Sequence, residues 1–562
     1  IAGISTAIAL KTQLKYTNFT IYERAASVGG TWRDNTYPGC GSDVPGHAYS
    51  LSSELNPEWS SYLVSQPEIR AYWEKLFCKH ELDNYTLFNH EIRSLDWDAD
   101  AQLWRLTVVD REAGAEKRVE AHLVVSAIGG FMYPLYPDIQ GRESFKGLTW
   151  HSARWRHDVD LTGKRVGVVG NGCSAAQLIP RISANPDVNV VNFCRTRQWY
   201  SPRVQYTYPA WSKLLFRNVP LLLWLYRNYL MVKAEFGYII FNKRHRLPIK
   251  VVTKVFSNYI KRTAPAKYHD ILIPPFPPGC KRIIIDPGFL ESLHRPNVSM
   301  VWDPIEKIEE TGITLGTGDF IPLDVIVYAT GYGLNPEAPM RGSMKLGIQE
   351  YFASQGGPTA YMGTCVPGLP NLFTLLGPNV ATGHSSVIFS EEVQIQYVLQ
   401  LMKPVIDGEV KSFEVQSAAS DAYNAWLQKR MEDSVWTECN SYYRSDRKHG
   451  KVVANFPGTM SLFWWTLRKP RWEDFKVVGG KAWTERRRRS DRLRLLGIVT
   501  SLVALIWFGS VNHKGIRKGL QFWIQKVSSF SSMACTCVET LNRGRGGMEM
   551  KDREYMLCSL TI

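Results

Sequence analysis

The chain has 562 residues and a formal net charge of +15 at pH 7. That length allows at least two domains, each with a core of its own. From Lys476 to the end there are 16 Lys and Arg against 6 Asp and Glu, so most of the excess charge belongs to a C-terminal tail. Because the rest of the chain is only mildly basic, a nucleic-acid-binding protein is not favoured.

The ten cysteines are scattered along the chain. Cys535 and Cys537 form a C-x-C pair, but no C-x-x-C occurs. Because the cysteines form no framework, we expect reduced thiols and a reducing compartment. His151 has no second metal ligand at a helical or hairpin offset, so a metal site is not indicated.

The chain opens as IAGISTAIALKTQL, an apolar helix pattern, and continues into the short strand FTIYE. A nucleotide-binding βαβ unit places an acid about 20 residues beyond its glycines, and Gly3 and Glu23 have this spacing. The first strand and the first two glycines of G-x-G-x-x-G are missing. We interpret the segment as part of an N-terminally truncated dinucleotide-binding domain, with an ordinary amphipathic helix as the alternative.

A second unit, KRVGVVGNGCSAAQLI, is complete. Its strand leads through a glycine turn into a helix, where a pyrophosphate can approach the backbone closely. The following strand ends at Arg195 and not at an acid, and Arg matches the 2′-phosphate of NADPH. We expect NADPH contacts from residues of this turn and of the strand end: Gly170, Asn171, Gly172, Cys173, Ser174, Ala175, Arg195 and Thr196.

Two apolar strands that end in small residues, LVVSAIGGFMYPLYP and DVIVYATGYGLN, flank this second unit. A chain that leaves one nucleotide domain, builds a second and returns has two such crossings. We predict an α/β fold with two nested Rossmann-like dinucleotide-binding domains. FAD occupies the outer domain, residues 1–133 and 325–475, and NADP the inner domain, residues 134–324. A helical insert at 206–262 either lines a substrate entrance or packs as core.

The tail, residues 476–562, contains Leu495–Val511, which is 17 residues without a charge. A transmembrane helix needs about 20 apolar residues, with a range of about 17 to 25. The basic cluster Arg486–Arg489 upstream favours a catalytic body that faces the cytoplasm. We expect a membrane-associated protein with a single-pass helix, and a cytoplasmic protein as the alternative. After Val527 the sequence has neither apolar periodicity nor a motif.

The stretch FKGLTWHSARW has the spacing F-x-G-x-x-x-H-x-x-x-W, formed by Phe145, Gly147, His151 and Trp155. A histidine among aromatic residues is most often a packed core residue. Between two nucleotide-binding units, however, the stretch closely resembles the fingerprint of flavin-dependent Baeyer–Villiger monooxygenases. Related flavin monooxygenases that oxidise nitrogen or sulfur usually end the pattern in Tyr or Phe. Arg156 departs from the Pro or Asp that often follows this Trp in the family.

The resemblance extends over most of residues 1–475 and includes several further motifs. Gly29-Gly30-Thr31-Trp32, Tyr37-Pro38-Gly39 and Gly377-Pro378-Asn379 with Gly383-His384-Ser385 are similar to flavin-side loops, and Ala329–Tyr332 to the return crossing. Cys280-Lys281-Arg282 followed by Asp286 is similar to the loop with the family's active-site Arg. The resemblance implies FAD contacts from Gly3, Glu23, Gly30, Thr31, Trp32, Asp43, Tyr49 and Asn379, and further NADP contacts from Gly41, Ser42 and Asp43.

The resemblance also implies a reaction in which NADPH reduces FAD and reduced flavin traps O2 as a C4a-peroxide. The peroxide anion attacks a ketone carbonyl, and an ester or lactone results. A fixed cation favours the anion and stabilises the oxyanion that follows. In this family-based prediction Arg282 is that cation, Asp43 holds it in place, and both are catalytic. His151 and Trp155 are expected to couple NADP binding to domain geometry.

Other classes of protein fit the sequence less well. A disulfide reductase needs two cysteines close together near the flavin, and Cys40 has no such neighbour. A nitrogen or sulfur oxygenase needs a protonated hydroperoxide, which Arg282 and Trp155 argue against. An inactive flavoprotein relic stays open because the first fingerprint is incomplete. The aromatic-rich chain and the candidate membrane helix favour a lipophilic natural-product ketone as the substrate beside the O2 that the resemblance implies. The oligomeric state is not indicated.

Overall fold

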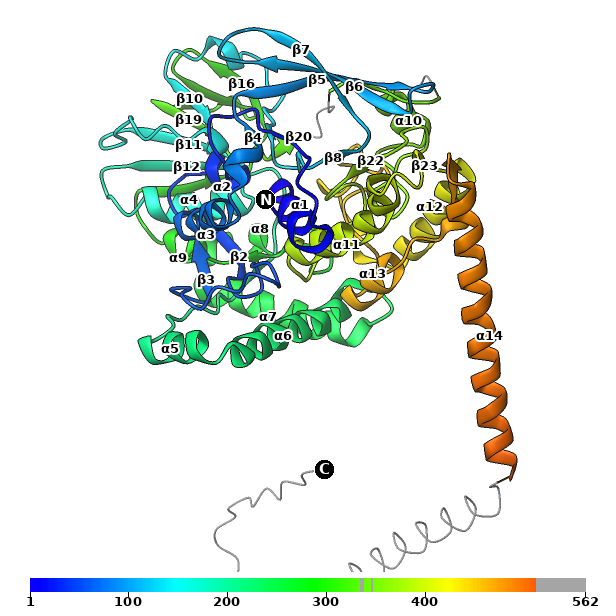
Figure 1. The fold of residues 1–562 in the computed structure, drawn as a ribbon. Coiled ribbons are helices and arrows are strands. Elements are labelled where there is room, and N and C mark those ends of the chain that lie inside the picture. The colour runs from blue at the N-terminus through cyan, green and yellow to red at the C-terminus, as the bar shows by residue number, and fades with distance from the viewer. Residues whose placement is uncertain (334–337, 345–346, 512–562) are drawn as a thin grey trace, which may run out of the picture. The chain divides into compact units, whose positions relative to one another are not determined.

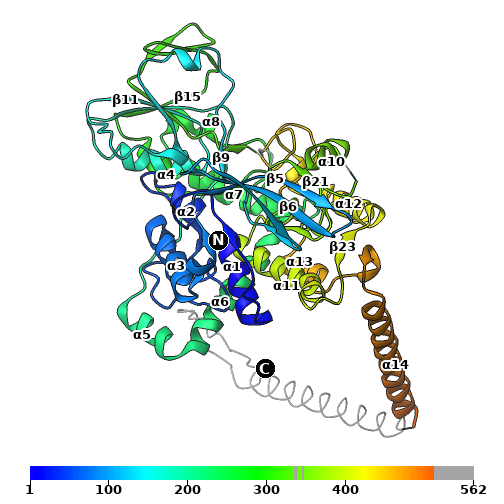
Figure 2. The same ribbon diagram turned by 45° about the horizontal axis from the view of Figure 1, so that its top comes forward.

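The computed structural model describes residues 1–333, 338–344 and 347–511, apart from the side chains of residues 491, 494, 495, 498 and 505–511. The chain divides into two compact units, Ile1–Gly480 and Lys481–Ile562. Figures 1 and 2 show the first unit as a mixture of helices and short sheets. The segment after Val527 and the Cys535–Cys537 pair lie outside the described residues.

The inner nucleotide-binding part is built on a five-stranded parallel sheet. Its order is β10 (Leu148–His151), β19 (Val325–Tyr328), β11 (Arg165–Val169), β12 (Asn189–Phe193) and β15 (Val298–Val301). Val168 packs in one buried cluster with helix α4 (Cys173–Ile182), whereas Val169 packs in another with β17 (Gly312–Leu315). Apolar side chains are therefore buried on both faces, as expected for a parallel sheet.

The outer part combines segments from both sides of this inner part. Parallel pairs join β1 (Ile21–Tyr22) to β4 (Thr86–Leu87) and β8 (Val124–Ser126) to β22 (Leu372–Thr374). Helix α1 (Ala2–Ala9) packs against α3 (Gln66–Lys79) and against α11 (Val387–Ile406). Since β22 and α11 follow the inner part in sequence, the chain leaves the outer part and returns to it.

The remaining strands form small sheets around these two parts. One has the order β21 (Met340–Arg341), β5 (His90–Asp98), β6 (Leu103–Asp110) and β7 (Glu116–Ala121), and another joins β16 (Ile305–Glu309), β17 and β18 (Phe320–Pro322). The two-stranded pairs are β2 (Gly41–Pro45) with β3 (Leu63–Ser65), β9 (Tyr133–Pro134) with β20 (Tyr332–Gly333), β13 (Tyr200–Ser201) with β14 (Ile284–Ile285), and β23 (Ser412–Val415) with β24 (Phe475–Val478). Further helices are α2 (Thr31–Asp34), α8 (His269–Leu272), α9 (Phe289–Ser292), α10 (Ile348–Ser354), α12 (Ser417–Met431) and α13 (Met460–Leu467).

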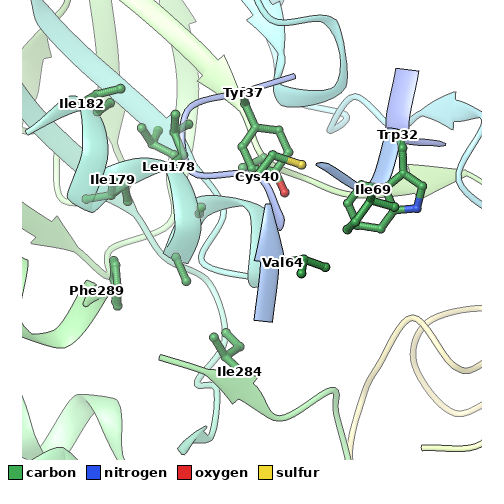
Figure 3. Close-up of a cluster of buried hydrophobic side chains, with 14 of the residues drawn as sticks. Trp32, Tyr37, Cys40, Val64, Ile69, Leu178, Ile179, Ile182, Ile284 and Phe289 are labelled. Atoms are coloured by element: carbon green, nitrogen blue, oxygen red, sulfur yellow. The ribbon is translucent and has the colours of Figure 1, made fainter. Parts of the chain in front are cut away.

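The two nucleotide-binding parts share a buried core, which Figure 3 shows. Trp32, Tyr37 and Val64 of the outer part lie in the same cluster as Leu178 and Ile179 of α4. Gly39 allows this approach: it has φ +85°, and a Cβ there would lie 2.5 Å from the carbonyl oxygen of Gln177. The Tyr37 hydroxyl also donates to Gln177 Oε1 at 2.8 Å. The Tyr-Pro-Gly segment therefore fastens the outer part to α4.

The predicted insert forms three helices, α5 (Ala210–Asn218), α6 (Pro220–Phe236) and α7 (Arg246–Thr263). Leu223, Leu230 and Met231 of α6 are buried. Many large apolar side chains of the insert are nevertheless exposed. Core packing, the alternative considered from the sequence, therefore explains only one side of α6.

The C-terminal unit begins with α14 (Lys481–Val511), which contains the whole segment Leu495–Val511. Among the described residues no helix is long and apolar enough to cross a membrane. Arginines occupy much of the first half of α14, which leaves too short an apolar run before residue 505, and the side chains of 505–511 lie outside the described part. The prediction of a single-pass transmembrane helix is therefore not supported, nor is the membrane localisation that rested on it.

The expectation that the thiols are reduced is wrong for one pair of cysteines. Cys280 and Cys439 form a disulfide with a Cα–Cα distance of 6.1 Å. They are 159 residues apart in sequence, so only the fold brings them together. Among the described residues Cys40, Cys78, Cys173, Cys194 and Cys365 are free thiols.

Candidate active site

Arg282 and Asp43 form an ion pair between segments that are 239 residues apart. Asp43 is on β2, and Arg282 lies two residues before β14. Arg282 donates from Nε to Asp43 Oδ2 at 2.9 Å, and its Nη2 lies 2.7 Å from the same oxygen in the ion pair. The negative charge of Asp43 raises the pKa of Arg282 further above its usual value, so the guanidinium stays charged.

The turn of the second nucleotide unit ends beside this ion pair. The charges of Asp43 and Arg282 both act on the Cys173 thiol, the first residue of α4, although burial is the main cause that raises its pKa to about 12. Gly41 is also tied to α4, because its carbonyl oxygen accepts a bond from Gln177 Nε2 at 3.0 Å. Ser42 donates to the carbonyl oxygen of Val44 at 2.9 Å within β2. The predicted catalytic pair and part of the predicted NADP site therefore lie together.

The glycines of the turn have the geometry that close backbone approach requires. Gly170 has φ +112°, and a Cβ there would lie 2.5 Å from the carbonyl oxygen of Ala329. Gly172 is the N-cap of α4, and Ala175 is fully buried in its first turn. Asn171 donates to the carbonyl oxygen of Thr196 at 2.9 Å, which joins the turn to the end of β12. Ser174 also belongs to the first turn of α4, where unpaired backbone N–H groups favour an anion.

Arg195, just after β12, lies close enough to Lys281 and to Arg447 for its charge to act on both. Burial lowers the pKa of Lys281 to about 8, and the charge of Arg195 contributes. Burial and Arg195 also lower the pKa of Arg447. In the described part of the chain none of the three forms an ion pair with a carboxylate, so their mutual repulsion favours a bound anion such as a phosphate. The sequence offered no motif for Arg447, which lies far along the chain from Arg195.

The flavin-side loop 29–32 is held by hydrogen bonds to the rest of the outer part. Trp32 donates from Nε1 to the Tyr49 hydroxyl at 3.2 Å, with the two rings edge to face. Gln66 donates to the Trp32 carbonyl oxygen. Gly30 has φ +51°, and Thr31 begins α2 after it. The predicted residues of this loop are thus placed together.

Glu23 does not present an unoccupied carboxylate. Its Oε1 accepts a bond from the backbone N–H of Ala25 at 2.9 Å and another from Arg33 Nη1 at 3.2 Å. Gly3 lies in α1, where an added Cβ would make only an ordinary contact with Ala127. The structure therefore provides weaker geometric support for these two residues than for the turn at 170–175.

The late loop of the outer part contains polar atoms without internal bonds. Thr382 Oγ1 and Ser385 Oγ are buried, and neither has a hydrogen-bond partner among the described residues. Asn379, which the family resemblance assigned to FAD, instead donates from Nδ2 to the carbonyl oxygens of Val452 and Asn455, each at 2.9 Å. Buried polar groups normally have hydrogen-bond partners, so the hydroxyls of Thr382 and Ser385 fit a polar ligand. The side chain of Asn379 supports this loop through its bonds to the backbone.

The fingerprint lies at the edge of the inner sheet. Gly147 has no room for a side chain, because a Cβ would lie 2.5 Å from the Phe145 ring and 2.6 Å from the Asp324 carbonyl oxygen. Burial lowers the pKa of His151 to about 4, so its ring is neutral at pH 7. The His151 ring contacts Tyr332, whose hydroxyl donates to Asn35 of the outer part. Trp155 packs edge to face on Trp150. His151 and Tyr332 therefore link the edge of the inner sheet to the outer part.

Comparisons with known proteins agree with this arrangement. A family model described as L-lysine 6-monooxygenase/L-ornithine 5-monooxygenase matches residues 60–206, and a model of an NAD(P)-binding Rossmann-like domain matches residues 1–65. A Baeyer–Villiger monooxygenase of Pseudomonas aeruginosa is 37% identical over 473 residues, which cover 83% of this chain and 87% of that protein. One of Streptomyces coelicolor is 32% identical over 486 residues, covering 85% and 91%.

The solved structures that resemble this chain have the same fold. The structure of OTEMO in complex with FAD and NADP matches with a TM-score of 0.75 at 24% identity, over 85% of this chain and 97% of that chain. Cyclohexanone monooxygenase from Rhodococcus sp. Phi1, bound to NADP+, matches with a TM-score of 0.74 at 23% identity over the same shares. The fold is thus an α/β dinucleotide-binding monooxygenase fold, and by its sequence relatives the chain belongs to the Baeyer–Villiger monooxygenase family.

Proposed function

We propose that the protein is an FAD- and NADPH-dependent Baeyer–Villiger monooxygenase that inserts one oxygen atom beside a ketone carbonyl to form an ester or lactone. The observation that carries the proposal is the Arg282–Asp43 ion pair beside the first turn of α4. A permanent cation at this place suits a reaction in which negative charge develops on a carbonyl oxygen.

The residues at the two cofactor sites fit the cofactors. The three cations Arg195, Lys281 and Arg447 fit the 2′-phosphate of NADP, and the turn Gly170–Ala175 fits its pyrophosphate. The unsatisfied hydroxyls of Thr382 and Ser385 fit the polar atoms of a flavin. We assign NADP to residues 134–324, FAD to 1–133 and 325–475, and a separate tail to 476–562.

The bound flavin, once reduced by NADPH, supplies the activated oxygen from O2. The chain's own contribution is electrostatic and positional. Arg282 donates hydrogen bonds to the carbonyl oxygen of the ketone as negative charge grows there. Asp43 accepts a hydrogen bond from Nε and lies in ion-pair contact with Nη2, which holds the guanidinium in place while its other N–H groups serve the substrate. His151 contributes no charge and positions the two nucleotide-binding parts through Tyr332.

The experiment is product analysis with the purified flavoprotein, NADPH, O2 and a panel of lipophilic ketones beside a thioether and an amine. We expect a ketone to gain one oxygen as an ester or lactone, which the mass and the connectivity of the product establish. Oxygen transfer to sulfur or nitrogen alone would place the protein with the nitrogen and sulfur oxygenases and remove the role of Arg282. A chain that binds no FAD would be an inactive relic.

A further inference from the structure

Helix α6 exposes a continuous stripe of large apolar side chains. Five exposed residues recur at spacings of three and four and so lie on one face of the helix: Leu221, Leu225, Tyr229, Val232 and Phe236. Trp224, three residues after Leu221, is exposed at the edge of this face. Half of the Trp224 surface and 75% of the Phe236 surface are exposed. Single exposed apolar residues are common on proteins, but a contiguous stripe of this length marks an interaction surface.

The opposite face of α6 already packs on the body of the protein. Leu230 and Met231 lie in a buried cluster with Ala48, and Val44 packs against the same cluster. A helix that is apolar on all sides is normally buried on all sides. Described residues cover only one side of α6. The exposed apolar stripe on its other side is therefore a candidate surface for a binding partner.

The other two helices of the insert also expose large apolar side chains. Helix α5 exposes Trp211 and Leu214, and α7 exposes Leu247, Val251 and Val255 at the spacing of one helical face. Figures 1 and 2 show α5 and α6 following each other along one edge of the first unit. We call the exposed side chains of α5, α6 and α7 the insert face.

The charge of the insert indicates what covers it. Residues 204–263 contain eleven Lys and Arg and a single acid, Glu235. Four of the eleven pair with carboxylates outside the insert, and these are Arg217, Arg227, Lys243 and Arg244. Glu235 is occupied, since its carboxylate accepts bonds from the backbone N–H groups of Met460 and Ser461 at the start of α13. Lys233, Lys250 and Lys254 are exposed and form no ion pair with any described residue. The insert face is therefore apolar and cationic together.

We propose that the insert face docks on an anionic lipid membrane surface, with the apolar stripe of α6 at the boundary between headgroups and acyl chains. Trp, Leu and Phe on one side of a helix with Lys and Arg around them are the composition of interfacial helices. Each Lys or Arg near an anionic leaflet adds a further attraction. This mode of attachment lies in the plane of the membrane and uses neither α14 nor a spanning helix.

Two other occupants fit the insert face less well. A second copy of the chain would bring two strongly cationic surfaces together, and like charges oppose such an interface. A nucleic acid would match the charge but would leave exposed Leu, Val and Phe side chains in contact with phosphates and water. An anionic lipid surface alone satisfies both the charge and the apolar stripe.

The test is sedimentation of the full chain with vesicles of phosphatidylcholine, with and without phosphatidylserine. We expect binding to the vesicles that contain phosphatidylserine and weaker binding at high salt. Trp224→Ser and Phe236→Ser are each expected to weaken vesicle binding about tenfold, since each removes a large apolar side chain from the lipid. Phe320→Ser, at an exposed site on β18 outside the insert, is the matched control and is expected to bind as the wild type does.

A second pair of variants tests the charge separately. Lys250→Glu with Lys254→Glu is expected to abolish the preference for phosphatidylserine, whereas Lys75→Glu on α3 is expected to keep it. Failure of the wild-type chain to bind vesicles would overturn the proposal. So would unchanged binding of the Trp224 and Phe236 variants, because another part of the chain would then hold the membrane. Self-association or RNA binding that these variants abolish, without vesicle binding, would identify a different occupant and also overturn it.

Discussion

The site around Arg282 and Asp43 and the insert face differ in whether other residues of the chain pair with their charges and cover their apolar side chains. The site around Arg282 and Asp43, with the cations Arg195, Lys281 and Arg447, is called the centre below. At the centre, Asp43 pairs with the charge of Arg282 within the fold, and an anionic cofactor would pair with the remaining cations. On the insert face, the apolar stripe of α6 and the lysines around it have no counterpart within the described chain. The centre is thus arranged for a reaction on a small substrate, whereas the insert face is arranged to bind a membrane surface.

The centre is tested most directly by removing its cation. Arg282→Ala is expected to lower the rate of ketone oxygenation by a factor of about 1,000 or more, because a preorganised charge at the carbonyl oxygen is lost. Flavin absorbance of the purified variant is expected to match the wild type. Arg282→Lys keeps the charge without the rigid fork and is expected to recover part of the rate. A wild-type rate in the alanine variant would contradict the assignment.

The disulfide beside Arg282 is expected to stabilise the fold of the centre. Cys439→Ser together with Cys280→Ser is expected to lower the free energy of unfolding by about 2–5 kcal/mol, because a long loop is no longer closed in the unfolded chain. Denaturant unfolding measures the change. Cys78→Ser, at an exposed free thiol, is the control and is expected to have almost no effect. Equal stability of the double variant would show that the disulfide does not form in solution.

The anion site is expected to discriminate between NADPH and NADH. Arg447→Ala and Arg195→Ala are each expected to raise the KM for NADPH by about tenfold to a hundredfold, since a charge-assisted bond to the 2′-phosphate is lost. The KM for NADH, which lacks this phosphate, is expected to change little. Steady-state kinetics with both cofactors decides the matter, and equal losses for the two would assign these residues to another role.

Two buried histidines give each region its own pH dependence. Burial lowers the pKa of His151, at the edge of the inner sheet, and of His47, beneath the insert, to about 4 in each case. Each histidine binds a proton in the unfolded chain at about pH 6.5 but not in the folded chain until about pH 4, so stability is present above pH 6.5 and is lost as the pH falls. Each contributes a slope of about 1.4 kcal/mol per pH unit in that window.

Replacement separates the two contributions. His151→Phe and His47→Phe are each expected to reduce the pH dependence of the free energy of unfolding by the contribution of one proton, about 1.4 kcal/mol per pH unit. The free energy of unfolding is measured between about pH 4 and pH 6.5. The His47 ring contacts Tyr208, Phe216 and Tyr226, so Phe is a compatible replacement there. Ketone oxygenation at pH 7 is expected to change only for His151→Phe. An unaltered slope in both variants would mean that other groups dominate acid unfolding.

Local patterns predicted much of the inner part and of the centre. The strand, glycine turn and helix around Gly170 are contiguous in sequence, and the structure has them as β11 and α4. Arg282 and Asp43 were paired only through the family resemblance, and the structure joins them. The FAD contact of Asn379 stays a prediction, and the structure shows its amide nitrogen bonded to the carbonyl oxygens of Val452 and Asn455. Sequence patterns locate such a residue but do not show which atoms its side chain meets.

The errors have a common physical cause. The disulfide and the Arg447 contribution depend on segments that meet only after folding, and no local spacing encodes such a meeting. The insert is helical in both the prediction and the structure, but the sequence cannot tell which face of an apolar helix is covered. The segment at 495–511 was judged by its own apolar run, whereas its helix begins with a long charged stretch.

The sequence by itself determined the elements whose causes are local: glycines at turns, apolar periods in strands and helices, and the cationic composition of the insert and the tail. The tertiary structure decided which charges meet, which thiols pair and which apolar face of α6 remains in water. Local geometry follows from the preferences of neighbouring residues, whereas burial and charge pairing follow from contacts between distant segments. The centre and the insert face owe their different properties to those distant contacts.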